Sequence, residues 1–264
     1  MRRQAACVLS SGGLDSAVLL RDALRTYRRV QPVYVRAGLR WEPAEERALR
    51  AFVRALRRVP SANGGFAGRD RRRLADPVAL AVPMADLYGV HWSTTGRRVP
   101  GYFAGDPSVY LPGRNIALLS KAATFCALRG FEVVITGILE ANPFPDGTPR
   151  FLRAMERALS AGLGRPIRIR APFRRMSKRQ VIRRGRDLPL GRTLSCCRPV
   201  RGGHCGRCVK CGERARAFRD AGIPDPTNYA GGPGVPATGR GAGRPGRKRS
   251  RTTRVAPKKT TSSR

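Results

Sequence analysis

Acidic residues are scarce in this chain of 264 residues. Only 17 Asp and Glu stand against 53 Lys and Arg, which gives a net charge of +36. Residues 231–264 hold ten of the basic residues and no acid, so residues 1–230 keep 43 basic and 17 acidic side chains, a net charge of +26. A body this basic favours polyanionic partners such as nucleic acid, nucleotides or acidic lipid. The alternative is an arginine-rich genome composition with solvated charged faces.

Long hydrophobic runs are also missing. No apolar stretch approaches the roughly 18 residues that a membrane span needs. The apolar run Ala5–Leu9 is too short for the core of a secretory signal. The sequence therefore predicts no membrane partner and a cytoplasmic location. Seven cysteines in such a chain indicate metal binding or chemistry rather than disulfides.

Short apolar runs alternate with amphipathic stretches through most of the chain. Such alternation predicts an α/β fold, a parallel sheet with helices on both faces. We expect strands at 5–9, 32–35, 78–82, 132–136 and 167–171, and helices at 14–28, 43–58, 114–129, 151–161 and 177–184. Residues 60–76 and 90–113 are expected to be irregular loops. Because long irregular loops in compact domains are usually functional, the second is a candidate part of an active site.

Composition divides the chain into three expected parts. Residues 1–190 form the α/β domain, residues 191–230 a small C-terminal metal-binding subdomain, and residues 231–264 a disordered basic tail. The tail consists of Gly, Pro, Arg, Lys, Ser and Thr with almost nothing apolar. It cannot bury enough surface to offset the entropy of ordering it.

A glycine-rich turn follows the first expected strand and opens the first expected helix. It reads Ser11-Gly12-Gly13-Leu14-Asp15-Ser16. The glycines let the backbone approach a phosphate, and the free N–H groups at the helix start point at it. Ser11 and Ser16 add hydroxyl donors, and Asp15 can cap the helix or help to hold magnesium. The string is neither a Walker A loop nor a dinucleotide fingerprint. A bare Ser-Gly-Gly would be only a capped turn, but the full string predicts a phosphate site.

Five cysteines fall within sixteen residues, at Cys196, Cys197, Cys205, Cys208 and Cys211. The last three are separated by two-residue gaps, which let neighbouring thiolates turn onto one ion. A fourth thiolate from Cys196 or Cys197 would close a tetrahedral and therefore structural zinc site, with His204 a weaker ligand candidate. An iron–sulfur cluster is the alternative.

These features together resemble a known family. The glycine-rich string is the signature of the N-type ATP pyrophosphatases, the PP-loop superfamily. Within it, the chain resembles the 7-cyano-7-deazaguanine synthases of the queuosine and archaeosine precursor pathway. The matching residues are Ser11–Ser16, 111–115, 136–137, 142–146, 171–173, 177–178, 193–211, Arg214, Phe218, 221–222 and 225–229. The run 193–211 is the most specific. The resemblance implies a Rossmann-like, adenine nucleotide alpha hydrolase-like fold.

The resemblance also implies an activity and its cofactors. The expected enzyme is an ATP-dependent carbon–nitrogen ligase that adenylates 7-carboxy-7-deazaguanine and uses ammonia to form 7-cyano-7-deazaguanine. ATP, catalytic Mg²⁺ and structural Zn²⁺ are the expected cofactors. In that family the first zinc cysteine follows a serine and lies eight residues before a His-Cys-Gly triplet, which selects Cys196. The implied zinc ligands are therefore Cys196, Cys205, Cys208 and Cys211.

Roles for single residues follow from the same resemblance. Residues 11–16 would cradle the pyrophosphate portion of ATP, with Asp15 and Ser16 also catalytic. Lys178 and Arg114 are expected to contact phosphate or an oxyanion. Arg114, Asn115 and Asp146 are expected to bind substrate, Asn115 through the purine-like ring and Asp146 through its exocyclic amine or through magnesium. The alternative for each is ordinary surface charge or a helix cap.

Two segments depart from the family's commonest pattern. Asp146-Gly147-Thr148 stands where those members carry Cys-Arg after Pro-Asp, and residues 91–101 also diverge. Both put the substrate or acceptor in question. The alternative function is a PP-loop adenylating enzyme that acts on a macromolecule, either a tRNA modifier or one that transfers a deazaguanine to a macromolecular amine. A nucleic-acid-binding zinc protein is disfavoured because the loop is intact. A homodimer and nonspecific nucleic-acid contact through the tail are further hypotheses.

The basic tail generates a first prediction. Truncation after Ala230 should leave turnover of a small substrate unchanged and should weaken the salt-sensitive retention of the chain on DNA. The tail carries ten positive charges, no acid and no aromatic side chain that could stack on bases, so its binding should be weak and without sequence preference. Steady-state kinetics and a DNA column eluted with salt measure the two effects. Loss of turnover on truncation would instead place the tail in the active site.

Overall fold

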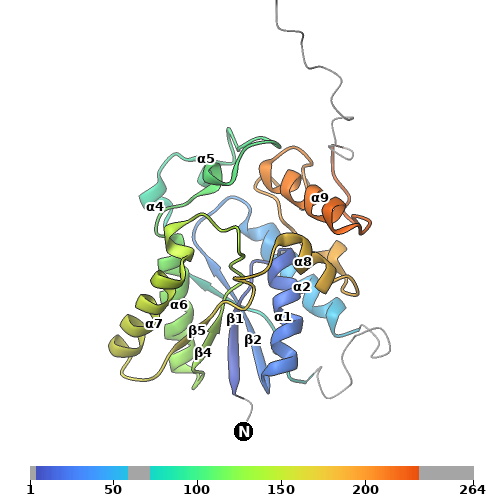
Figure 1. Cartoon of the computed structure of the whole chain (residues 1–264). Coiled ribbons are helices and arrows are strands. Elements are labelled where there is room, and N and C mark those ends of the chain that lie inside the picture. The colour runs from blue at the N-terminus through green and yellow to red at the C-terminus, as the bar shows by residue number, and fades with distance from the viewer. Residues whose placement is uncertain (1–3, 59–71, 232–264) are drawn as a thin grey trace, which may run out of the picture. The chain divides into compact units, whose positions relative to one another are not determined.

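The structure, a computed structural model, describes residues 4–58 and 72–231, which lie in one compact unit, Met1–Gly234. Among these residues five parallel strands form a sheet in the order β3-β2-β1-β4-β5 (Figure 1). The strands are β1 (Ala5–Leu9), β2 (Arg29–Arg36), β3 (Val78–Ala81), β4 (Val133–Ile135) and β5 (Arg168–Arg170). The predicted α/β class and all five expected strands are confirmed. Except for Gly231, the predicted tail lies outside the described residues, as does most of the loop expected at 60–76.

Helices cover both faces of this sheet. One face carries α1 (Leu14–Thr26), α2 (Glu42–Leu56), α8 (Lys178–Arg184) and α9 (Val209–Ala221), and the other carries α6 (Arg114–Leu128) and α7 (Pro149–Gly162). Because successive side chains of a strand point to opposite faces, Ala6 and Val8 pack toward α1, whereas Cys7 packs toward α6. The central strand is buried on both sides, which explains its uninterrupted apolar sequence.

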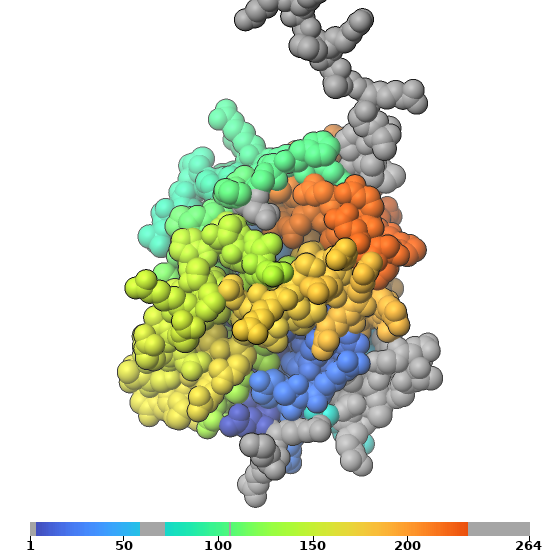
Figure 2. All heavy atoms as spheres, viewed as in Figure 1, coloured from blue at the N-terminus to red at the C-terminus, as the bar shows by residue number. Residues whose placement is uncertain are grey.

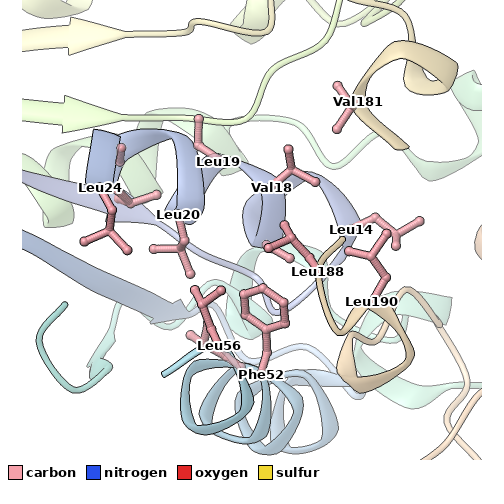
Figure 3. Packing of buried hydrophobic residues seen from close by; sticks show 14 of the residues in the cluster. Leu14, Val18, Leu19, Leu20, Leu24, Phe52, Leu56, Val181, Leu188 and Leu190 are labelled. Atoms are coloured by element: carbon pink, nitrogen blue, oxygen red, sulfur yellow. The ribbon is translucent and has the colours of Figure 1, made fainter. Parts of the chain in front are cut away.

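The larger core cluster lies between α1, α2 and the sheet. Figure 3 shows Phe52 and Leu56 of α2 against Leu20 of α1, with Leu188 and Leu190 closing the same cluster. Phe52 is 1% exposed. The apolar stripe of α2 recurs at 49, 52, 53 and 56, which is the spacing that puts side chains on one helical face.

One expectation about local structure was wrong. The segment 90–113 is not wholly irregular, since it contains α5 (Trp92–Thr95) and the 3-10 helix η2 (Asp106–Val109), and it follows the short helix α4 (Ala85–Tyr88). The α5 turn forms because the His91 side chain accepts a hydrogen bond from the Ser93 N–H and because Gly96 ends the turn in the left-handed region. Two further 3-10 turns are η3 (Pro145–Gly147) and η4 (Leu190–Arg192).

Helix α9 was not expected from the sequence. It begins directly after Cys208 and lies beside α8 on the surface (Figure 2). Within the described ranges, no helix has both the length and the apolar character needed to cross a bilayer.

The core generates a second prediction. Phe52→Ala should lower the free energy of unfolding by about 3–5 kcal/mol, because it removes a fully buried ring and leaves a cavity between α1 and α2. Leu128→Ala on α6 is the control, since Leu128 is 81% exposed, and its effect should stay within about 0.5 kcal/mol. Urea unfolding followed by circular dichroism measures both. Equal effects in the two variants would contradict the packing.

Candidate active site and metal centre

A cavity of about 440 Å³ opens where β1, β2 and β4 end and the loops beyond them meet. In open parallel sheets, ligands bind at this carboxyl edge of the strands. The structure brings together here seven of the residues singled out in the sequence, namely Ser11, Asp15, Ser16, Arg114, Asn115, Asp146 and Lys178. They come from the turn before α1, from α1, α6 and α8, and from η3, so chain topology rather than sequence proximity assembles the site.

The glycine-rich turn joins β1 to α1 as the sequence predicted. Gly12 has φ of 77°, and a Cβ there would lie 2.5 Å from the backbone oxygen of Glu45, so only glycine fits. Ser16 Oγ donates to the Gly13 carbonyl at 3.0 Å. The N-cap residue is Gly13, and no side chain of the described residues caps α1. Its first N–H groups therefore remain available to an anion, which is the requirement for a phosphate cradle.

Four charged side chains form a chain of ion pairs beside this turn. Lys178 Nζ lies 2.6 Å from Asp15 Oδ2 and 3.2 Å from Glu213 Oε1, and Lys210 Nζ lies 2.6 Å from Glu213 Oε2. Burial alone would lower the pKa of Lys178, but Asp15 and Glu213 outweigh it and raise that pKa. Burial opposes ionisation of Glu213 as well, yet Lys178 and Lys210 lower its pKa to about 2. Lys178 and Glu213 are therefore both charged at neutral pH.

One oxygen of Asp15 fits a magnesium ion. Oδ1 of this carboxylate is buried and has no hydrogen-bond partner among the described residues. Mg²⁺ prefers hard oxygen ligands of this kind and commonly takes one or two carboxylates together with phosphate oxygens. Asp15 would hold such an ion, and the ion would neutralise phosphate charge.

Arg114, Asn115 and Asp146 meet at the start of α6. The Asn115 backbone N–H donates to Asp146 Oδ2 at 3.1 Å, and Asn115 Nδ2 donates to Asp146 Oδ1 at 3.2 Å. Asp146 therefore fixes the first turn of α6. The Nε of Arg114 is buried without a hydrogen-bond partner among the described residues, so the guanidinium retains donor capacity. The roles of Asn115 and Asp146 toward substrate remain predictions.

A second cavity of about 210 Å³ also borders Asp15 and Arg114. It shares the ion-pair chain with the larger cavity, and its own walls include Gly13, Ser195 and Cys196. Trp41 and Trp92 also line it, stacked at 5.6 Å between ring centroids. The two cavities thus meet at the charged groups beside the glycine-rich turn.

The four predicted metal ligands are gathered in one buried cluster. The sulfur atoms of Cys196, Cys205, Cys208 and Cys211 all lie within 4.8 Å of one another. Three pairs are separated by 3.9, 3.9 and 3.6 Å. A Zn–S bond of about 2.3 Å places the sulfurs of a tetrahedral site about 3.8 Å apart, so the cluster fits zinc.

Backbone N–H groups and a histidine support this cluster. The Cys205 N–H donates to the sulfur of Cys196 at 3.4 Å. His204 is not in the cluster, because its Nε2 accepts a hydrogen bond from the Ser195 N–H at 3.0 Å. Burial and Arg214 lower the pKa of His204 to about 4, which keeps the ring neutral and able to accept. Cys197 is buried but lies outside the set of four.

Sequence reasoning missed three charged residues of the site. Lys210 and Glu213 lie on α9, whose helical spacing puts both on the side that faces Lys178. Glu45 lies in the first turn of α2 and lines both cavities. In the sequence, a functional role for Glu45 is indicated only by its position, because this carboxylate lies next to the apolar face of α2.

The fold and site define a class of protein. It is an α/β protein of the PP-loop type, with an uncapped helix behind a Ser-Gly-Gly turn and a four-thiolate centre beside it. The family model described as queuosine biosynthesis protein QueC matches residues 5–222. The chain belongs to the QueC family, as the sequence motifs indicated.

Similar proteins bear one name. A protein named 7-cyano-7-deazaguanine synthase from Anaeromyxobacter sp. strain Fw109-5 is 41% identical over 240 residues, 85% of this chain and 95% of that protein. Proteins of the same name from Anaeromyxobacter dehalogenans and Nitrosococcus oceani are 38% and 34% identical, over 85% of this chain and 95% and 97% of theirs. A solved structure titled as a predicted subunit of tRNA methyltransferase, from Methanocaldococcus jannaschii, covers 67% of this chain and 72% of that chain at 15% identity. Its TM-score is 0.36, too low to indicate a shared fold.

The cysteine cluster generates a third prediction. Cys196→Ser or Cys208→Ser should lose the metal and most of the soluble protein, because a structural zinc site contributes directly to folding. Cys197→Ser is the matched control and should keep about one zinc per chain. Zinc content by atomic emission and the melting temperature measure the outcome. If Cys197→Ser loses zinc while Cys196→Ser retains it, the ligand assignment is wrong.

Proposed function

We propose that this chain adenylates 7-carboxy-7-deazaguanine with ATP and uses ammonia to convert the activated carboxylate into the nitrile of 7-cyano-7-deazaguanine. The relatives bear the name of a carbon–nitrogen ligase, and this chain is an enzyme of the same family. One observation carries the proposal. The glycine-rich turn, Arg114 and Lys178 converge on a single cavity in a chain that matches these synthases over 85% of its length.

The chemistry explains why ATP is needed. A carboxylate is a poor electrophile because its leaving group would be oxide. Transfer of AMP to the carboxylate releases pyrophosphate and makes AMP the leaving group, so ammonia can form an amide. A second activation, at the amide oxygen, allows that oxygen to leave with AMP and gives the nitrile.

The residues of the turn position the nucleotide. The free N–H groups at the start of α1, with Ser11 and Ser16, would hold the pyrophosphate portion of ATP. Lys178 and Arg114 would stabilise charge that develops at the α-phosphate and the departing pyrophosphate, since both border the cavity where the two substrates must meet. Magnesium on Asp15 would supply further neutralisation of phosphate charge. Most of the catalysis is positioning and electrostatics.

The metal centre has a structural role in this proposal. Four thiolates close a tetrahedral site and leave no position for substrate. Cys208 and Cys211 flank the start of α9, so the metal would fix where Lys210 and Glu213 reach the active site. On this basis we propose residues 191–230 as a zinc-binding subdomain that completes the α/β domain of residues 1–190.

The fourth prediction tests the reaction. Purified protein with 7-carboxy-7-deazaguanine, ATP, Mg²⁺ and ammonium should yield 7-cyano-7-deazaguanine, AMP and pyrophosphate. Mass spectrometry measures the nitrile, and chromatography measures AMP and pyrophosphate. Asp15→Ala and Lys178→Met should each lower kcat by about 100-fold or more, because they remove charge from the transition state. Ser16→Ala should also lose turnover.

Matched controls separate chemistry from folding. Asp187→Asn and Lys121→Met change exposed residues outside both cavities and should leave kcat unchanged. Full activity in Asp15→Ala and Ser16→Ala would reject the site. The macromolecular acceptor would be favoured instead if the protein consumed ATP and 7-carboxy-7-deazaguanine without forming the nitrile. In that case a modified product should form only when a tRNA or a protein amine is added.

A further inference from the structure

Two buried carboxylates in the first turn of α2 are treated differently by the fold. Glu42 and Glu45 are 5% and 8% exposed. Both oxygens of Glu42 are used, because they accept the backbone N–H groups of Ala37 and Gly38 at 2.6 and 3.1 Å. Glu42 is therefore explained by the loop that it holds.

Glu45 has no such explanation. Its Oε2 accepts a hydrogen bond from the Tyr34 hydroxyl at 2.9 Å, and the described part of the chain provides no hydrogen bond to Oε1. No basic side chain there forms an ion pair with Glu45 within 4.0 Å, although 12 other such pairs are formed. Because Glu45 lines the cavities and its Oε1 has neither a hydrogen-bond donor nor a paired cation among the described residues, a small cationic donor in the cavity would stabilise this carboxylate.

The position of Glu45 indicates which ligand that is. It lines both cavities, at the boundary that also contains Asp15, Arg114 and Lys178. The backbone of Glu45 touches the glycine-rich turn at Gly12, so the side chain starts directly beside the phosphate cradle. In the proposed reaction, the carboxylate substrate and the α-phosphate of ATP meet beside Arg114 and Lys178, which line this boundary, and ammonia reaches the same carbon atom.

We propose that Glu45 binds the ammonium ion and removes one of its protons, which makes it the base for amide formation. The inference rests on the proposed function. Ammonium is small, positive and rich in N–H donors, so it supplies what the free Oε1 lacks. Trp41 also lines the smaller cavity together with Glu45, and an indole ring is a favourable neighbour for a cation.

The step balances as follows. One N–H bond of ammonium breaks and its proton goes to the Glu45 carboxylate. The nitrogen lone pair forms a C–N bond to the acyl carbon, and the bond from that carbon to the AMP oxygen breaks, with AMP leaving with the electron pair. A second proton passes from nitrogen to water, and Glu45 returns its proton to solvent before the next turnover.

The surroundings suit a base that works near neutral pH. The groups that act on Glu45 are Tyr34 of β2, Glu42 of α2, Arg114 of α6 and Lys210 of α9. Burial raises the pKa of Glu45, while Arg114, the Tyr34 hydrogen bond and Lys210 hold it down, with a balance at about 7. Burial and the neighbouring carboxylates raise the pKa of Tyr34, so its hydroxyl stays protonated and donates. A base is most effective when its pKa lies near the operating pH.

The fifth prediction separates the two half-reactions. Glu45→Gln should keep the shape of the side chain and the Tyr34 contact. With 7-carboxy-7-deazaguanine present and ammonia absent, the rate at which labelled pyrophosphate exchanges into ATP should stay within about twofold of the wild-type rate. In the same variant kcat/KM for ammonium should fall by about 100-fold or more. The ratio of wild type to variant should rise between about pH 6 and about pH 8, as Glu45 ionises.

Hydroxylamine and a neighbouring glutamate provide the controls. Hydroxylamine is largely unprotonated at neutral pH and needs no initial proton removal, so Glu45→Gln should form the hydroxamate at nearly the wild-type rate. Glu46→Gln alters the next residue of α2, which pairs with Arg36 and Arg50 outside both cavities, and should leave kcat/KM for ammonium unchanged.

The results distinguish this inference from the proposed function. Wild-type protein without acid-dependent pyrophosphate exchange would overturn both. Normal exchange with undiminished kcat/KM for ammonium in Glu45→Gln would overturn only the role of Glu45. An equal fall in exchange, ammonium use and hydroxylamine use, or a drop in melting temperature that accounts for all three, would show that Glu45 is structural and would also overturn it.

Discussion

The ammonium group of Lys178 links the parts of this molecule that must act together. It lies on α8 and is held by Asp15 on α1 and Glu213 on α9, at 2.6 and 3.2 Å. Because these side chains are partly buried, removing one partner would leave a charge without full compensation, so the three helices are coupled through Lys178. A second link runs through the backbone, where the Leu194 N–H donates to the Gly12 carbonyl at 2.8 Å. The phosphate turn is thus tied to the cysteine segment twice.

This arrangement gives the metal centre a physical reason to lie beside the active site. The cysteine cluster includes Cys208 and Cys211, which flank the first turn of α9. That turn presents Lys210 and Glu213 to Lys178. The chain has only 17 acidic residues, yet four of them, Asp15, Glu45, Asp146 and Glu213, line the larger cavity. In a strongly basic protein, these carboxylates position the neighbouring Lys and Arg side chains and offset the repulsion between them.

The sequence was informative where one short segment carries the whole signal. β1, β3 and β4 could be predicted because each is an apolar run, and the phosphate turn because Gly12 and Gly13 stand between a strand and a helix. The sequence could not predict the roles of Lys210, Glu213 and Glu45. On an isolated helix each is an ordinary charged residue, and only the packing of α2 and α9 against the turn brings these side chains into the site. The short helix α5 was missed because it depends on the side-chain cap from His91.

The departure from the family pattern after Asp146 has a local structural explanation. Where the commonest members carry Cys-Arg, this chain has Gly147 and Thr148. A Cβ on Gly147 would lie 2.5 Å from Asn142 Oδ1, so the Asn142 side chain occupies the space that a larger residue would need. Thr148 caps α7 by accepting the Phe151 N–H at 3.2 Å. Asn142 also lines the cavity, and Asp146 beside it keeps its contact with Asn115.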